Sequence, residues 1–220
     1  MVSIIIVNYN TRKITANCIQ SIFEHTKLIE FEVILVDNAS SDGSREYIKT
    51  NFPKVKLISS KENIGFGRAN NLGAKYAKGD FLFLLNSDTI LIENSIQKFI
   101  SFFIENEKKL NIGVLGTLLV DENLKSNGYG NSFPTCYKEN KKNWRKIPFL
   151  RSFLLDPITK IYDFEKEYFE IDYVIGADMF IRKELFDKMN GFSEDFFMYY
   201  EESDLQKRIS NLGYKQYIFT

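Results

Sequence analysis

The stretch Asp80-Phe-Leu-Phe-Leu-Leu-Asn-Ser-Asp88 decides the fold class of this chain. Its unbroken apolar run, 81–85, is typical of a strand that is buried on both faces of a parallel sheet. In open α/β sheets, ligands bind beyond the carboxyl ends of such strands. Asn86, Ser87 and Asp88 occupy that end, and their oxygens are suited to holding Mg2+ or Mn2+ against a diphosphate. Asp88 could instead act only as the N-cap of a following helix.

Apolar runs and amphipathic stretches alternate along the first 110 residues. They predict strands at 2–7, 31–36, 55–59 and 81–85, and helices at 12–25, 41–48, 65–78 and 93–105. This alternation indicates βαβ units and an α/β fold with a Rossmann-like, mostly parallel sheet flanked by helices. Right-handed crossovers then bring the strand carboxyl ends to one rim. Beyond residue 110 we expect strands at 112–120 and 173–181, an irregular segment at 121–170, and helices at 183–189 and up to residue 212.

Composition limits the classes of function. Hydrophobic residues make up 44% of the 220, which suits one large globular domain or two small ones. Lys plus Arg and Asp plus Glu both number 29, and this balance argues against a general nucleic-acid binder. His25 is the only histidine, so a multi-histidine metal site is excluded. Cys18 and Cys136 are expected to be reduced thiols. No secretory leader and no apolar run of about 20 residues is visible, so we expect a cytoplasmic protein.

Polar clusters follow each of the first four predicted strands. They are Asn8-Tyr9-Asn10, Asp37-Asn38, the group from Asn63 to Asn71, and Asn86-Ser87-Asp88. On one rim, Asp37 can accept hydrogen bonds from a base or a ribose, while Arg68 and helix N-terminal amides can meet phosphate. Gly65-Phe-Gly67 is not a dinucleotide fingerprint, because Asn70 stands at the third glycine position and the motif follows the third strand. A dehydrogenase is therefore not indicated.

A second carboxylate group, Glu201-Glu202-Ser203-Asp204, opens the last predicted helix. Acids in a first turn suit the helix dipole, which is one interpretation. The other is a general base that reaches an acceptor hydroxyl. The aromatic run 196–200 before it would form an apolar wall that can raise a carboxyl pKa and stack on a sugar face.

Six motifs in this order resemble family 2 glycosyltransferases, closest to the rhamnosyltransferase-like branch. They are Val2-Ser-Ile-Ile-Ile-Val-Asn-Tyr-Asn-Thr11, Leu35-Val-Asp-Asn-Ala-Ser-Ser-Asp-Gly-Ser44, Asn63-Ile-Gly-Phe-Gly-Arg-Ala-Asn-Asn-Leu-Gly73, Leu84-Leu-Asn-Ser-Asp-Thr89, Gly176-Ala-Asp-Met-Phe-Ile-Arg182 and Gly191-Phe-Ser-Glu-Asp-Phe-Phe-Met-Tyr-Tyr-Glu-Glu-Ser-Asp-Leu205. The resemblance implies a GT-A fold with a nucleotide-sugar-binding half, 1–110, and a smaller half, 111–220, that binds the acceptor and carries the catalytic base.

The implied activity is a metal-dependent, inverting hexosyl transfer in bacterial surface polysaccharide synthesis. The donor would be a nucleoside-diphosphate sugar such as a UDP- or dTDP-sugar, the acceptor a glycan or a lipid-linked saccharide, and the cofactor Mg2+ or Mn2+. This activity is compatible with a cytoplasmic protein that contacts the inner face of the plasma membrane peripherally.

The resemblance also assigns roles to residues of this sequence. Val7, Asn8 and Tyr9 would line the base pocket, and Asp37 would bind the base or ribose. The remaining nucleotide-binding positions would be Asn63, Gly65, Arg68, Asn71, Asn86 and Asp88, with Asp88 as the metal ligand. Glu202 takes the place of the catalytic base with Glu201 beside it, and Asp204 begins the supporting helix.

The sequence departs from the family pattern at three places. Asn86 replaces the usual first acid of the metal motif, and Glu202 replaces the commoner Asp, which adds one methylene of reach. Related chains continue past the equivalent of Thr220, often with a histidine at the metal site, so we expect a truncated chain.

Two other functions stay open. One is a non-catalytic nucleotide-sugar-binding module. The other is a sugar nucleotidyltransferase, although the loop 8–11 lacks the glycine-rich pattern expected there. The basic cluster of Lys141, Lys142, Trp144 and Arg145 could guide an anionic acceptor or form a solvated loop.

Overall fold

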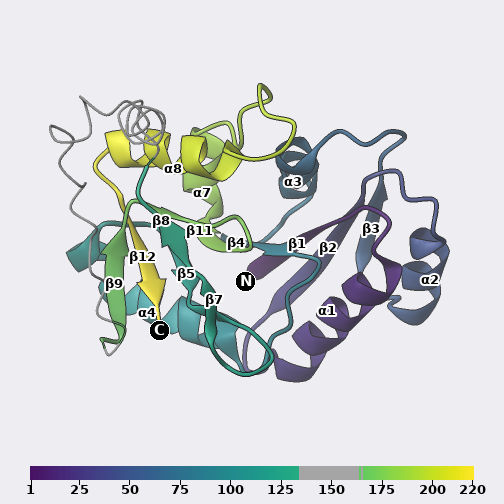
Figure 1. The fold of residues 1–220 in the computed structure, drawn as a ribbon, viewed down its shortest axis with the longest axis horizontal. Coiled ribbons are helices and arrows are strands. Elements are labelled where there is room, and N and C mark those ends of the chain that lie inside the picture. The colour runs from purple at the N-terminus through teal and green to yellow at the C-terminus, as the bar shows by residue number, and fades with distance from the viewer. Residues whose placement is uncertain (134–163, 165) are drawn as a thin grey trace, which may run out of the picture.

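The computed structural model describes residues 1–133, 164 and 166–220, and its centre is an eight-stranded sheet with helices on both faces (Figure 1). The strand order is β3-β2-β1-β4-β11-β5-β12-β9. The strands are β1 (Val2–Asn8), β2 (Phe31–Asp37), β3 (Lys56–Ser59), β4 (Phe81–Asn86), β5 (Ile112–Thr117), β9 (Tyr168–Ile171), β11 (Asp178–Arg182) and β12 (Lys215–Phe219). This architecture confirms the expected α/β class.

The sheet is parallel in its first half and mixed in its second. β1 pairs in parallel with β2 and β4, β2 with β3, and β5 with β12, whereas β11 is antiparallel to β4 and β5, and β9 to β12. Because β11 runs in the opposite direction, its first residue, Asp178, pairs with Leu85 near the carboxyl end of β4. The amino end of β11 therefore joins the carboxyl ends of the parallel strands on one rim.

Helices cover both faces of the sheet. α1 (Arg12–His25), α2 (Ser44–Asn51) and α4 (Ser95–Leu110) pack on one face, and α3 (Phe66–Lys75), α7 (Lys183–Lys188) and α8 (Glu201–Asn211) on the other (Figure 1). Strand side chains alternate between the two layers, so Ile4 and Ile6 face the first and Ile5 the second. Two small sheets pair β6 (Leu119–Val120) with β7 (Ser126–Gly128), and β8 (Gly130–Asn131) with β10 (Tyr173–Val174).

One aromatic core joins the two halves of the chain. Phe180 of β11 stacks on Phe99 of α4 and on Phe81 of β4, each at a ring-centroid distance of 5.1 Å. Aromatic pairs of this kind contribute about 0.5–1.5 kcal/mol beyond their buried area. Residues of both halves of the chain therefore share one packed aromatic core.

Several predicted boundaries were wrong, for local reasons. The helix expected at 41–48 begins at Ser44, because Gly43 adopts a left-handed conformation (φ 77°) and the Asp42 carboxylate accepts the Ser44 N–H at 3.0 Å. The strand expected at 112–120 splits after Thr117, whose N–H binds the Asp178 carboxylate at 2.7 Å.

Three further predictions differ from the structure. The helix expected at 65–78 ends at Lys75, where the Tyr76 N–H bonds the carbonyl of Gly73 and tightens the last turn. The strand expected at 173–181 splits into β10 and β11 around residues 175–177. The segment expected to be irregular holds β7, β8 and β9, which are too short to show a clear periodicity.

Cys18 is a buried free thiol, as expected. Cys136 and the basic cluster at 141–145 lie outside the described residues. Within the described ranges, none of the helices combines the length and the apolar character that crossing a bilayer requires.

Candidate active site

The carboxyl ends of β1, β2 and β4 lie side by side on the rim. Asn8 pairs in register with Asp37, and Val7 pairs with Asn86. Because β1 is parallel to both β2 and β4, the three strands run in one direction and end on the same rim. The sheet thus brings together three of the four polar clusters that the sequence places at strand ends.

Asp37 lies at the centre of a buried polar network. Its carboxylate accepts the Asn8 Nδ2 at 2.8 Å and the Ser40 N–H at 3.0 Å. Asn8 Oδ1 in turn accepts the hydroxyls of Thr11 and Thr15. The Asp37 side chain is 0% exposed, so a ligand could reach it only if a neighbouring side chain moved. Its contact with a base or ribose stays a prediction, and the contact observed is the one that holds the β1–α1 and β2–α2 loops together.

Arg45 lies against this network at the surface. The Arg45 Nε lies 3.5 Å from Asp37 Oδ1, and its Nη2 donates to the Ser40 carbonyl at 3.1 Å. Tyr9, which follows Asn8 in the chain, is 49% exposed. Arg45 was missed by the sequence reasoning, since nothing local distinguishes it from any other charged residue in a first helical turn.

The loop before α3 is tied to the rim by side-chain amides. Asn38 Nδ2 donates to Asn63 Oδ1 at 2.7 Å, and Asn38 Oδ1 accepts the Ile64 N–H at 2.9 Å. Gly65 follows with φ 84°, and a Cβ there would lie 2.4 Å from the Phe197 carbonyl oxygen. Only glycine therefore allows the close approach of the loop that precedes α8.

Arg68 and Asn71 face that same loop. The Arg68 Nε donates to the Glu194 carbonyl at 3.2 Å, and a second guanidinium nitrogen binds the same oxygen. Asn71 exchanges two hydrogen bonds with the backbone of Phe192, at 2.8 and 2.9 Å. Their predicted contact with a nucleotide is untested, whereas their observed contact joins α3 to the α7–α8 loop.

Asn86 and Asp88 stand at the tip of β4. The Asn86 N–H donates to the Ala177 carbonyl at 2.9 Å, which fixes the backbone. Asp88 is exposed, and neither its carboxylate nor the Asn86 side-chain amide forms a hydrogen bond or ion pair with another described residue. Both groups are free to meet a ligand from solvent.

The acid pair opens α8. Glu201 is 3% exposed, and its Oε2 is buried without a hydrogen-bond partner among the described residues. Burial, together with the charge of Glu202, raises the pKa of Glu201 above its ordinary value. Burial also raises the pKa of the half-buried Glu202. A helix N-terminus favours the ionised form of a carboxyl, so the raised pKa values of Glu201 and Glu202 mean that burial outweighs the helix dipole here.

Short contacts connect the acid pair with the β4 tip. A Cβ added at Gly176 would lie 3.7 Å from the Glu202 Cβ, and the next residue, Ala177, binds Asn86. On the other side, a Cβ at Gly67 would lie 3.5 Å from the Glu201 Cβ. Glu202 therefore lies beside Gly176, one residue from the partner of Asn86, and Glu201 lies beside the start of α3.

Asp178 is a buried acid that sequence reasoning did not single out. Its Oδ2 accepts the Thr117 N–H at 2.7 Å and the Thr117 hydroxyl at 2.6 Å, while its Oδ1 is buried without a partner among the described residues. Burial raises the pKa of Asp178 to about 7. A lone acid within the apolar run 177–181 is the signal that could have identified it.

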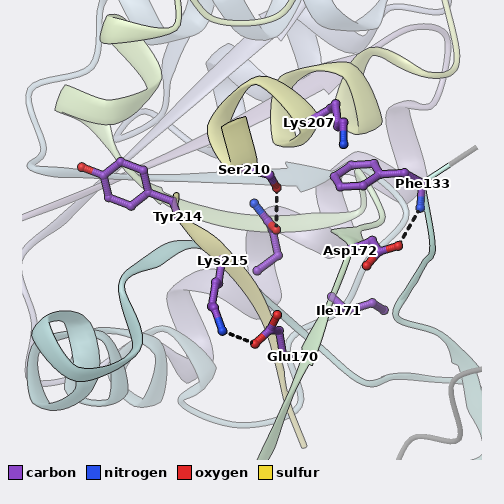
Figure 2. Close-up of a pocket in the computed structure, with 9 residues that line it drawn as sticks. Phe133, Glu170, Ile171, Asp172, Lys207, Ser210, Tyr214 and Lys215 are labelled. Carbon is purple, nitrogen blue, oxygen red and sulfur yellow. Dashed lines mark hydrogen bonds and ion pairs between the residues drawn. The ribbon is translucent and has the colours of Figure 1, made fainter. Parts of the chain in front are cut away.

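Two hollows lie near these elements. One, of about 730 Å³, is lined by Asn86, Asp88, Asp178 and apolar residues of the β4–α4 segment and the β6–β7 hairpin. The acid pair and Asp37 do not line it, so a single shared hollow stays a prediction. The other, of about 440 Å³, lies where α8 meets β9 and β12, and Figure 2 shows Lys215 paired with Glu170 and Lys207 beside the ring of Phe133.

A divalent ion fits the β4 tip only with help from a substrate. Among the described residues no group of three or more His, Cys, Asp or Glu side chains could hold a metal. Asp88 would be the only charged protein ligand, with Asn86 beside it. This donor set suits Mg2+ or Mn2+, which commonly take further oxygens from water and phosphates.

Comparison with known proteins identifies relatives of the chain. It is similar to the glycosyltransferase GlyG of Streptococcus pneumoniae serotype 4, with 31% identity over 44% of this chain and 33% of that protein. It is 32% identical to the Escherichia coli UDP-Glc:alpha-D-GlcNAc-diphosphoundecaprenol beta-1,3-glucosyltransferase WfgD, over 48% of this chain and 42% of that protein. A Mycobacterium tuberculosis N-acetylglucosaminyl-diphospho-decaprenol L-rhamnosyltransferase is 23% identical over 83% of this chain and 62% of that protein. The chain thus spans less than two thirds of the length of these relatives.

Solved structures share the fold. The mannosyltransferase PcManGT of Pyrobaculum calidifontis, in complex with GDP-Man and Mn2+, has a TM-score of 0.65 and 17% identity, over all of this chain and 54% of that one. Staphylococcus aureus TarS 1–349 in complex with UDP has a TM-score of 0.66 and 16% identity, over 99% of this chain and 57% of that one. These likenesses confirm the GT-A fold. The Glycosyl transferase family 2 model matches residues 3–189, so the chain belongs to glycosyl transferase family 2.

Proposed function

We propose that this chain is the catalytic part of an inverting glycosyltransferase that acts in bacterial surface polysaccharide synthesis. A hexosyl group would move from a nucleoside-diphosphate sugar, such as a UDP- or dTDP-sugar, to a hydroxyl of a glycan or lipid-linked saccharide. Residues 1–110 would bind the donor, and residues 111–220 would bind the acceptor. Family membership and the names of the relatives support this assignment.

One observation carries the proposal: the Asn86–Asp88 tip and the acid pair flank the short segment Gly176–Ala177. A displacement reaction needs different groups on the two sides of the reacting carbon. One side must bind a leaving diphosphate, and the other must accept a proton from the attacking hydroxyl. The exposed Asp88 suits the first task together with a metal, and the half-buried Glu202 suits the second.

The reaction would proceed as a single displacement. The oxygen of the acceptor hydroxyl forms a bond to the anomeric carbon while Glu202 takes the hydroxyl proton. The bond from the anomeric carbon to the diphosphate breaks on the opposite side. Attack opposite the leaving group inverts the anomeric centre, as in inverting glycosidases. Asp88 and Asn86 would hold Mg2+ or Mn2+, which when bound offsets the charge that develops on the diphosphate. Because burial raises the pKa of Glu202, its carboxylate is a stronger base than an exposed one.

The test separates donor binding from transfer. Nucleoside-diphosphate sugars with Mn2+ should raise the melting temperature of the wild type, because a ligand that binds only the folded state stabilises it. Glu202→Gln should keep this shift and lose transfer by about 100-fold or more. Glu105→Gln, an exposed residue of α4 on the other face of the sheet, is the matched control and should keep both. Full turnover by Glu202→Gln would refute the base assignment. Donor binding by the wild type with no product from any saccharide acceptor would favour the non-catalytic module.

A further inference from the structure

Four consecutive apolar side chains are exposed directly before the acid pair. Phe197, Met198, Tyr199 and Tyr200 are 53%, 55%, 72% and 56% exposed. We call this segment, Phe197–Tyr200, the aromatic platform. It belongs to the loop that joins α7 to α8 and projects beside α3 (Figure 1). Contiguous exposed apolar surface of this kind usually marks a binding site.

The backbone of this loop is firmly held although its side chains are exposed. The Phe66 N–H donates to the Phe197 carbonyl at 3.2 Å, and Arg68 binds the Glu194 carbonyl. Arg208 of α8 donates to the carbonyls of Met189 and Gly191 at 2.6 and 2.9 Å. A platform fixed in this way loses little conformational entropy when it binds a ligand.

The platform is also strained at its end. Tyr199 and Tyr200 have φ values of 72° and 71°, in the left-handed region that residues with a bulky side chain rarely adopt. Asn or Gly would fit this backbone at lower cost. Strain that is retained at exposed aromatic residues, one step from two acids with raised pKa values, points to a function for the rings.

The charge around the platform restricts its ligand. The segment 193–204 carries five acids, Glu194, Asp195, Glu201, Glu202 and Asp204, and no Lys or Arg. Two arginines from other elements contact this loop, because Arg68 binds the Glu194 carbonyl and Arg208 pairs with Asp204, so acids still outnumber basic groups there. An anionic membrane surface attracts basic segments, so this composition disfavours it. A neutral saccharide suits the composition, because its C–H face can stack on an aromatic ring while its hydroxyls donate to carboxylates.

We propose that the aromatic platform binds a pyranose ring of the acceptor saccharide, with Tyr199 and Tyr200 as the stacking residues. The stacked ring would present a neighbouring hydroxyl to Glu202, two residues along the chain from Tyr200. This inference rests on the proposed function and names the part of the chain that would recognise its acceptor.

The test uses three variants and two probes. Binding is measured to an array of immobilised neutral hexose and N-acetylhexosamine glycans, and to vesicles of phosphatidylcholine with phosphatidylglycerol. Tyr199→Asn should weaken glycan binding by about tenfold. Because Asn tolerates the left-handed backbone, the same variant should raise the melting temperature by about 2–4 °C. Tyr199→Phe keeps the ring and should bind as the wild type does. Tyr76→Asn, at the opposite end of α3 and 47% exposed, is the matched control and should leave glycan binding unchanged.

Four results would overturn the inference. They are the absence of glycan binding by the wild type, unchanged glycan binding by Tyr199→Asn, loss of binding by Tyr199→Phe, and a lower melting temperature of Tyr199→Asn, which would give the ring a structural role. Vesicle binding that disappears in Tyr199→Asn would assign the platform to a membrane instead. Stabilisation by nucleoside-diphosphate sugars is measured on the same samples. Its absence in the wild type would contradict the proposed function and not the platform.

Discussion

Asp178→Asn should remove a pH dependence of stability that originates in one buried carboxyl. In the folded chain burial raises the pKa of Asp178 to about 7, against an ordinary value of 3.8. At a pH between these two pKa values, Asp178 is ionised in the unfolded chain and protonated in the folded chain. Folding then takes up one proton, so the free energy of unfolding falls as the pH rises, by about 1.4 kcal/mol per pH unit. Over roughly three units the loss is about 4 kcal/mol, and it is complete above the folded pKa.

Asparagine resembles the protonated carboxyl in shape and charge. Its oxygen can accept the same two hydrogen bonds from Thr117, and its amide takes the place of the unpartnered Oδ1. The variant and the wild type should therefore be about equally stable near pH 4, and the variant more stable by about 4 kcal/mol at pH 8.

Urea unfolding at pH 4, 6 and 8 measures the difference. Subtracting the two curves isolates Asp178, because the raised pKa values of Glu201 and Glu202 contribute to both proteins. Glu122→Gln, an exposed acid of the β6–β7 hairpin, is the control and should leave the wild-type dependence intact. Parallel curves for Asp178→Asn and the wild type would show that Asp178 is ionised in the folded chain and refute the reasoning.

Three further predictions concern the rim. Asp88→Asn should weaken nucleotide binding in the presence of Mn2+ but not in its absence, as isothermal titration calorimetry would show; equal weakening under both conditions would contradict a metal role. The transfer rate should fall as the pH is lowered through the raised pKa of Glu202, because the base must be ionised, and a pH profile centred at the ordinary Glu value of 4.5 would count against its burial. Gly65→Ala should destabilise the chain by about 1–3 kcal/mol in urea unfolding, through strain and a 2.4 Å contact with the Phe197 carbonyl oxygen. Gly213→Ala has a similar φ of 88° but only a 4.0 Å contact, so an equal loss in both variants would exclude the contact as a cause.

The strand tips were predictable because their signals are local. The apolar runs of β1, β2 and β4 and the polar residues that end them are contiguous, and parallel pairing then places Asn8, Asp37 and Asn86 together. The acid pair was also visible, since Glu201 and Glu202 open a helix after a distinctive aromatic run. Family motifs added the expected order of these parts.

The partners of the polar side chains were not predictable in the same way. Arg68 and Asn71 bind the backbone of a loop more than 120 residues away, and Asp37 is buried under Asn8, Ser40 and Arg45. The antiparallel insertion of β11 between β4 and β5 brings Asp178 and Ala177 to the rim. No periodicity encodes such long-range contacts, because each depends on which distant group packing leaves within hydrogen-bond distance.

The sequence by itself determined the α/β class, the family and the identity of the acids at the strand and helix ends, because apolar periodicity and short motifs are written in neighbouring residues. Only the tertiary structure decided which of those polar groups form hydrogen bonds that hold loops in place and which, like Asp88, remain open to a ligand. It also decided that the aromatic platform is exposed. The physical reason is that burial and pairing are properties of the packed chain, and one polar group cannot satisfy a distant backbone and a substrate at the same time.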